Sequence, residues 1–128
     1  MADVLLVEDD EDVAFLLEIF LTEDGHQVRR AADGERGLAL LGERLVDLVV
    51  LDVEMPVLDG PGMAARMLAE DAGREQIPIV LLSGVVDLSG AARRVGTPYA
   101  LAKPFDPGAM LALVSRALRE RRAPTPGG

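Results

Sequence analysis

Five side chains with reactive or metal-binding groups stand at or just after apolar runs of the sequence: Glu8, Asp9, Asp52, Ser83 and Lys103. If the fold gathers the carboxylates, two of them roughly 5 Å apart repel by about 3 kcal/mol at an effective dielectric of about 20. A hard divalent cation relieves this repulsion, and oxygen ligands suit Mg²⁺. A carboxylate beside an ammonium and a hydroxyl is suited to accept a phosphoryl group, with Asp52 as the nucleophile.

Lys103 stands out because it is the only lysine in a chain with twelve arginines, and it directly precedes a proline in "ALAKPF" (100–105). The arginine-rich background indicates a genome that favours arginine, so a lysine here calls for a reason. A flexible ammonium can reach a phosphoryl site that a broad, planar guanidinium would not fit. The sequence therefore predicts that Lys103 points at the same site as the carboxylates.

The elements that position these residues alternate between strand and helix. Continuous apolar runs predict buried strands at 3–7, 47–51 and 77–83, and weaker signals predict strands at 26–31 and 99–102. Apolar residues at helical spacing predict a first helix that stops at Gly25. Further helices are expected at 33–44, 61–71, 87–96 and from Asp106 onward, with Asp33 and Asp106 as N-caps and Gly90 interrupting the fourth.

Five strand–helix repeats with continuous apolar strands indicate an α/β fold, in which a parallel sheet is covered by helices on both faces. We adopt for it the flavodoxin-like (βα)5 three-layer sandwich with strand order 2-1-3-4-5. In that order strands 1, 3, 4 and 5 are neighbours, and ligands bind at their carboxyl ends. All five reactive residues are then expected in one shallow cleft.

The totals bound the class of protein. At 128 residues, 49% hydrophobic and 27% charged, the chain is expected to form one domain over 1–121, followed by a flexible tail or linker over 122–128. A net charge of −9 argues against direct nucleic-acid binding. The chain has no cysteine, no apolar run of the ~18 residues that span a bilayer and no secretion signal. We therefore expect a cytoplasmic protein without a membrane contact.

Four segments in order, "LLVEDD", "VVLDVEMPVLDG", "IVLLS" and "LAKPF", resemble the signatures of bacterial two-component response-regulator receiver domains. The resemblance covers roughly residues 2–121. It implies a phospho-acceptor signalling domain of a phosphorelay, in which Asp52 takes a phosphoryl group from a histidine kinase or phosphotransfer protein and switches interactions with a downstream protein. It implies no enzymatic turnover beyond this phosphorylation and its reversal.

The same resemblance implies roles for the other site residues. Mg²⁺ would be bound by Asp9, Asp52 and the backbone carbonyl of Glu54, with Glu8 acting through water. The hydroxyl of Ser83 would contact the phosphoryl group. Lys103 would pair with the phosphoryl oxygens, and its bond to the following proline would be cis.

The sequence departs from the family on the side that usually carries the output. Receivers usually have Tyr or Phe three residues before the lysine, where this chain has Ala100, and Tyr99 comes one residue early. A shift of one residue turns the side chain to the other face of the strand. The segment from Ser83 to Lys103 is also about two residues short. These departures put the usual aromatic switch and dimer face in doubt, but not the phosphorylation chemistry.

Other functions remain open at this level. An aspartate-nucleophile, Mg²⁺-dependent phosphatase would also use a strand followed by Asp52, although Glu54 is followed by Met-Pro instead of a small hydroxyl residue. A pseudo-receiver would act only as a binding module. A flavodoxin-type binder needs a phosphate loop where this chain has repulsive acids. His26, the only histidine, is interpreted as a surface residue and not as a phosphodonor.

Overall fold

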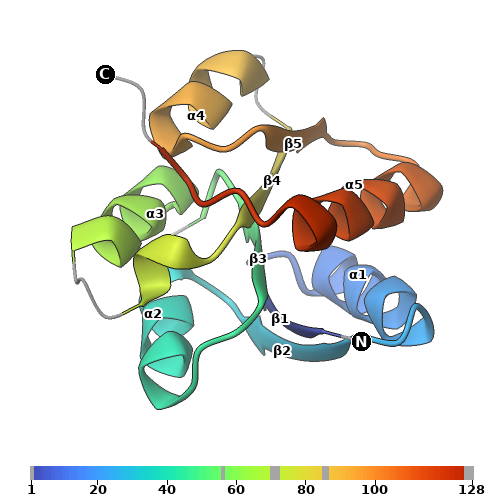
Figure 1. The fold of residues 1–128 in the computed structure, drawn as a ribbon. Helices are drawn as coiled ribbons and strands as arrows, with labels where there is room; N and C mark the ends of the chain where they lie inside the picture. Colours follow the sequence, from blue (N-terminus) through green and yellow to red (C-terminus); the bar gives the residue numbers. More distant parts are fainter. Residues whose placement is uncertain (1, 56, 70–72, 85–86, 126–128) are drawn as a thin grey trace.

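The computed structural model describes residues 2–55, 57–69, 73–84 and 87–125 (Figure 1). Strands and α-helices alternate along the chain, as the apolar pattern predicts. Their bounds are β1 Asp3–Val7, α1 Glu11–Glu23, β2 Gln27–Ala31, α2 Gly34–Glu43, β3 Leu48–Asp52, α3 Gly60–Ala69, β4 Ile79–Ser83, α4 Leu88–Val95, β5 Tyr99–Ala102 and α5 Pro107–Glu120. A short 3-10 helix, η1 (Arg74–Gln76), precedes β4.

The five strands form one parallel sheet in the order β2-β1-β3-β4-β5, which confirms the predicted flavodoxin-like topology. The register places Val7 beside Leu51, Asp52 beside Leu82 and Ser83 beside Ala102. The carboxyl ends of β1, β3, β4 and β5 therefore meet at one edge of the sheet. At the ends that lie within the described residues, predicted and observed boundaries differ by no more than two residues, whereas 70–71, the predicted end of the third helix, lie outside the described residues.

Two apolar cores lie on opposite faces of the sheet (Figure 1). One joins the sheet to α2, α3 and α4, and the other joins it to α1 and α5. The residues of the central strands are almost fully buried because both faces are covered. Their side chains alternate between the two cores, which is why the strands read as continuous apolar runs.

Aspartates cap the helices that begin near the site. Asp10 accepts hydrogen bonds from the backbone N–H groups of Asp12 and Val13 at the start of α1, and Asp33 and Asp106 cap α2 and α5 as predicted. Such caps satisfy backbone donors that have no partner within the helix. They fix the points at which the chain turns from strand to helix beside the site.

The expectation that Gly90 interrupts the fourth helix was wrong. The structure has an uninterrupted α4, with Gly90 in its first turn. The backbone N–H of Gly90 donates to Asp87 Oδ1 at 2.9 Å, and a Cβ at this position would collide with the Asp87 carboxylate. The glycine therefore makes room for the helix cap.

His26 was interpreted as a surface residue, and this was also wrong. Its side chain is only 7% exposed and lies between the end of α1 and β2, with Nε2 3.4 Å from Asp24 Oδ2. Neither ring nitrogen has a hydrogen-bond partner among the described residues. Burial removes His26 from the surface that an incoming protein could reach.

The chain turns at the end of α5. Arg121 adopts a left-handed conformation with φ of 52°, and the backbone continues toward the end of α4 (Figure 1). The N–H of Thr125 donates to the Gly96 carbonyl at 2.8 Å, and Pro124 is buried. The first four residues of the predicted tail, 122–125, thus contact the domain, whereas 126–128 lie outside the described residues. The division at residue 121 stays a prediction.

No helix in the described part of the chain combines the length and the apolar character needed to cross a membrane.

Candidate functional site

The candidate site lies at the carboxyl edge of the sheet. Glu8 and Asp9 follow β1, Asp52 is the last residue of β3, Ser83 is the last residue of β4, and Lys103 follows β5. Four segments far apart in the sequence therefore converge, because parallel strands present the same ends to the same edge. These five residues lie at the same edge of the sheet, as the sequence predicts.

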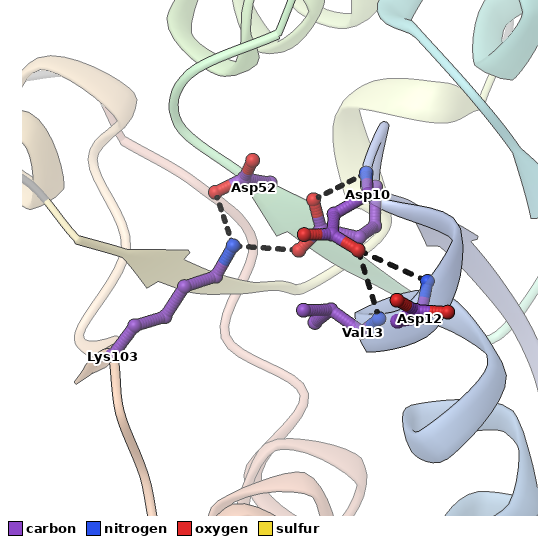
Figure 2. A network of polar contacts seen from close by, with 6 residues as sticks. Asp10, Asp12, Val13, Asp52 and Lys103 are labelled. Atoms are coloured by element: carbon purple, nitrogen blue, oxygen red, sulfur yellow. Dashed lines mark hydrogen bonds and ion pairs between the residues drawn. The ribbon is translucent and has the colours of Figure 1, made fainter.

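Lys103 links two of the carboxylates (Figure 2). Its Nζ lies 2.6 Å from Glu8 Oε1 and 3.1 Å from Asp52 Oδ1. Its backbone N–H donates to the Ser83 carbonyl at 2.7 Å, and the Lys103–Pro104 peptide bond is cis, as the resemblance implied. The side chain thus spans the distance from the end of β5 to the end of β3.

Glu8 is a buried acid with a raised pKa. The residue is 4% exposed, Oε1 accepts from Lys103, and Oε2 accepts from the backbone N–H of Asp10 at 3.2 Å. Burial raises the pKa of Glu8 from 4.5 to about 7, against the Lys103 hydrogen bond, which lowers it, and with the Asp52 charge, which also raises it. Burial opposes the charge on Lys103, yet the hydrogen bonds to Glu8 and Asp52 together raise its pKa.

Glu8, Asp9 and Asp52 each offer a carboxylate oxygen, and these oxygens lie within 4.8 Å of one another. Glu8 and Asp52 are buried, while Asp9 is exposed. One ammonium, that of Lys103, faces three acids, so this cluster retains an excess of negative charge near neutral pH. The all-oxygen donor set and the open side at Asp9 fit a hard divalent cation that keeps part of its water shell.

Ser83 and Glu54 complete the predicted set. Ser83 is fully buried at the end of β4, beside Ala102 of β5. Glu54 follows β3 in the loop that leads to α3, and its side chain is exposed. The structure therefore puts all six residues at one edge, where Lys103 directly contacts Glu8 and Asp52.

Comparison with known proteins agrees with this geometry. Residues 4–115 match the family model described as the response regulator receiver domain. The chain belongs to this family. The transcriptional regulatory protein PrrA of Mycobacterium tuberculosis is 38% identical over 120 residues, which cover 92% of this chain and 50% of PrrA. AfsQ1 of Streptomyces coelicolor, also a transcriptional regulatory protein, is 46% identical over 83 residues, which cover 65% of this chain and 35% of AfsQ1.

Among solved structures, a putative response regulator from Chloroflexus aurantiacus superimposes with a TM-score of 0.85 at 34% identity, covering 92% of this chain and 98% of that one. The chain spans half or less of the length of PrrA and AfsQ1. The family match makes it a receiver domain of two-component signalling.

The receiver's fifth strand carries the departure predicted from the sequence. Tyr99 is fully buried in the core formed with α1 and α5, whereas Ala100 packs against the core formed with α2, α3 and α4. The Tyr99 hydroxyl lies 3.0 Å from Glu120 Oε1, and the backbone N–H of Arg122 donates to it at 3.4 Å. The ring is thus fixed on the face opposite the one where receivers usually carry their aromatic residue.

The sequence analysis missed the glycine that opens α3. A Cβ on Gly60 would lie 2.5 Å from the Asp52 carbonyl oxygen, and the Gly60 N–H donates to the Val53 carbonyl at 3.0 Å. Gly60 therefore allows the chain to return directly against the backbone of Asp52. The signal was the dipeptide Asp59-Gly60 directly before a helix, which predicts a turn but not which backbone the turn approaches.

Proposed function

We propose that Asp52 is the phospho-acceptor of this receiver. The observation that carries the proposal is the Asp52 carboxylate at the end of β3, 3.1 Å from Lys103 Nζ and within 4.8 Å of carboxylate oxygens of Glu8 and Asp9. A carboxylate oxygen of Asp52 attacks the phosphorus of a phosphohistidine, the P–N bond breaks, and the leaving imidazole nitrogen keeps the electron pair. An aspartyl-phosphate remains on the receiver.

Lys103 and Ser83 hold the transferred group. Lys103 is already within reach of Asp52, so its ammonium can neutralise phosphoryl oxygens without a large movement. Ser83 ends the neighbouring strand and offers a hydroxyl to the same oxygens. Moving the ammonium from Glu8 toward the phosphoryl group would leave Glu8 without this partner, which favours a cation next to it.

We propose that this cation is Mg²⁺, held by Asp9, Asp52 and the backbone carbonyl of Glu54, with Glu8 acting through water. Bound there, Mg²⁺ would shield the carboxylates from the incoming phosphoryl oxygens and neutralise charge that develops on them. The protein side of the site supplies two fixed acids on β1 and β3 and an exposed third position. Asp9→Ala should therefore abolish both Mg²⁺ binding and phosphorylation, and full labelling in excess EDTA would exclude a metal requirement.

The phosphodonor is proposed to be a histidine kinase or phosphotransfer protein that docks beside Lys103. An apolar groove of about 400 Å³ lies between α1 and the start of α5, with Lys103 at its edge, and is lined by Val13, Leu16, Leu17, Phe20, Pro104 and Phe105. Phe15 and Leu16 on α1 are 58% and 52% exposed. A protein that carries the phosphohistidine to Asp52 can bury this surface while it reaches the site.

We propose that the phosphorylated chain acts through a downstream protein and does not itself contact nucleic acid. We also propose that it turns over no other substrate and works in the cytoplasm. Repeated hydrolysis of small phosphomonoesters would instead favour the phosphatase, and failure of any phosphoryl group to attach would favour the pseudo-receiver.

The test is labelling of the protein with phosphoramidate and Mg²⁺, followed by mapping of the modified peptide. Modification of Asp52 in the wild type and none in Asp52→Asn is the expected result. Asp47→Asn is a matched control, since Asp47 lies before β3 at the opposite edge of the sheet. Undiminished labelling of Asp52→Asn would refute the assignment.

The docking surface is tested in a separate experiment. Leu16→Ser should slow phosphoryl transfer from the cognate kinase but leave labelling by phosphoramidate unchanged, because a small donor does not use the groove. Equal slowing with both donors would show that Leu16 acts on the site or the fold and not on docking.

A further inference from the structure

The loop between β3 and α3 is held by the start of α2, which lies far from Asp52 in the sequence. The backbone N–H of Gly34, the first residue of α2, donates a hydrogen bond to the carbonyl of Leu58, near the end of this loop, at 3.0 Å. A Cβ on Gly34 would lie 2.6 Å from that carbonyl oxygen and 3.0 Å from Leu58 Cβ. No side chain therefore fits at Gly34 unless the backbone of the loop moves away from α2.

The other end of the loop is equally constrained. The Gly60 N–H donates to the Val53 carbonyl, and the Asp52 carbonyl oxygen occupies the space of a Gly60 Cβ. Asp59 Oδ1 accepts the N–H of Gly62 at 2.8 Å. Close backbone contacts thus fix the two ends of the loop, where it leaves Asp52 and where it enters α3, and residue 56 between them lies outside the described residues.

Val57 adopts a backbone conformation that its own residue type disfavours, which indicates that the contacts of the loop determine its backbone. It has φ of 69°, in the left-handed region that a β-branched residue rarely adopts, and its side chain is 80% exposed. Its own contacts do not explain the conformation, because most of its side chain faces solvent. Such strain persists where the surrounding structure determines the backbone, and it concentrates at functional sites.

We propose that Gly34 is a positioning residue for the metal and phosphoryl chemistry at Asp52. Because it lets α2 approach and hydrogen-bond Leu58, it holds the β3–α3 loop, and with it the Glu54 carbonyl, at the edge where Asp9 and Asp52 stand. This inference rests on the proposed function, in which the Glu54 carbonyl is a metal ligand. It assigns α2, which supplies no ligand of its own, a part in setting the affinity for Mg²⁺.

Gly34→Ala tests the inference, and Gly42→Ala on the same helix is its matched control. Gly42 is exposed, and a Cβ there would meet only the guanidinium end of the Arg74 side chain, at 3.2 Å. Mg²⁺ dissociation constants are measured from amide chemical shifts in NMR titrations, with unfolding in EDTA and amide hydrogen exchange of 53–60 as independent readouts.

We expect Gly34→Ala to raise the Mg²⁺ dissociation constant about tenfold or more, the range found when outer contacts of a metal site are lost. Hydrogen exchange in the metal-free loop should accelerate, and labelling of Asp52 should recover at high Mg²⁺. Gly42→Ala should bind Mg²⁺ as the wild type does. A merely structural role for Gly34 would lower the unfolding temperature but leave the dissociation constant of the folded protein unchanged, and that result would overturn the inference.

A second variant covers the case in which Gly34→Ala does not fold. The Leu58 side chain packs against the core shared by α2 and α3, so Leu58→Ala weakens the attachment of the loop to α2 without introducing a collision. It should still raise the dissociation constant several-fold. Wild-type affinity in Leu58→Ala would then overturn the inference. A wild-type protein that neither binds Mg²⁺ nor is labelled would refute the proposed function as well, so the two failures are distinguishable.

Discussion

Strand β5 begins at Tyr99 and ends next to Lys103, and these two side chains are held by different kinds of contact. The Tyr99 ring is fully buried among aliphatic side chains of α5, its hydroxyl bonds Glu120, and the Arg116 guanidinium lies 5.5 Å from the ring centroid. Lys103 is held by the charges of Glu8 and Asp52. A phosphoryl group and a cation would change the second set of contacts directly, and nothing in the first set.

The comparison indicates where a conformational response can arise. A ligand shifts an equilibrium only by what it binds differently in the two states. The Tyr99 end offers no such difference, and Ala100, on the other face, has no ring to move. The response must therefore run through an element that is held weakly and lies close to the site.

We expect helix α4 to be that element. Its buried residues are only Gly90, Ala91 and Val95, whereas α5 buries Met110, Val114 and Ala117 around Tyr99. Less buried apolar area means a smaller free energy for local opening. Ala100 packs on the same side of the sheet as Ala91 and Val95, so this face has small side chains where receivers usually place an aromatic ring.

Removal of the Tyr99 ring should give the largest effect on stability. Tyr99→Ala leaves a cavity in the α1–α5 core and should lower the free energy of unfolding by about 3 to 5 kcal/mol. Tyr99→Phe loses only the hydroxyl contacts and should lower it by about 1 kcal/mol. Chemical denaturation measures both. At a temperature where the variants are folded, Asp52 should still be labelled at the wild-type rate, and slower labelling in Tyr99→Phe would show that the two ends of β5 are coupled.

The pH dependence of the free energy of unfolding should reveal the contribution of Glu8, the partner of Lys103. The pKa of Glu8 is 4.5 in the unfolded chain and about 7 in the folded protein, so the folded state binds this proton more tightly. The contribution of Glu8 to stability is therefore fully present below pH 4.5 and is lost as the pH rises to about 7. The loss is at most about 3 kcal/mol, at about 1.36 kcal/mol per pKa unit.

Glu8→Gln should flatten this dependence in metal-free protein, since the amide does not titrate in this range. The measurement is urea denaturation in EDTA at about pH 5 and about pH 7.5, with the exposed Glu23→Gln as control. A wild-type slope that persists unchanged in Glu8→Gln would show that another group carries it.

Lys103→Arg should act on chemistry more than on stability. The guanidinium cannot place a single charge between Glu8 and Asp52 as the ammonium does, so we expect labelling of Asp52 about ten- to a hundredfold slower, with the fold intact. Lys103→Met sets the level for complete loss of the charge. Wild-type labelling and partner binding in Lys103→Arg would mean that the lone lysine has no special geometric role.

The fold and the site edge could be predicted because they depend on patterns within short segments. Apolar runs marked the buried strands, and the known consequence of parallel topology placed Asp52 and Lys103 together without any knowledge of side-chain contacts. The reversal of Tyr99 and Ala100 followed from the period of two along a strand. In each case the local sequence and the global arrangement agree.

The errors occurred where tertiary contacts override local preference. Gly90 is a poor helix residue, but the Asp87 cap requires it, and His26 is polar but lies under the turn between α1 and β2. The pKa of Glu8 depends on a burial that no neighbour in sequence reveals. The approach of Gly34, the first residue of α2, to Leu58 in the β3–α3 loop depends on how the helices pack and not on the local sequence.

We propose that phosphorylation of Asp52 changes the conformation of α4 while the Tyr99 end of β5 stays fixed. Amide hydrogen exchange tests it most directly when the metal-free protein is compared with a beryllofluoride–Mg²⁺ form, in which beryllofluoride stands in for the phosphoryl group. We predict that exchange changes from Gly84 through Gly96 and stays the same at Tyr99 and along the C-terminal half of α5. Changes confined to other regions, or a loss of the response in Tyr99→Ala, would contradict the account.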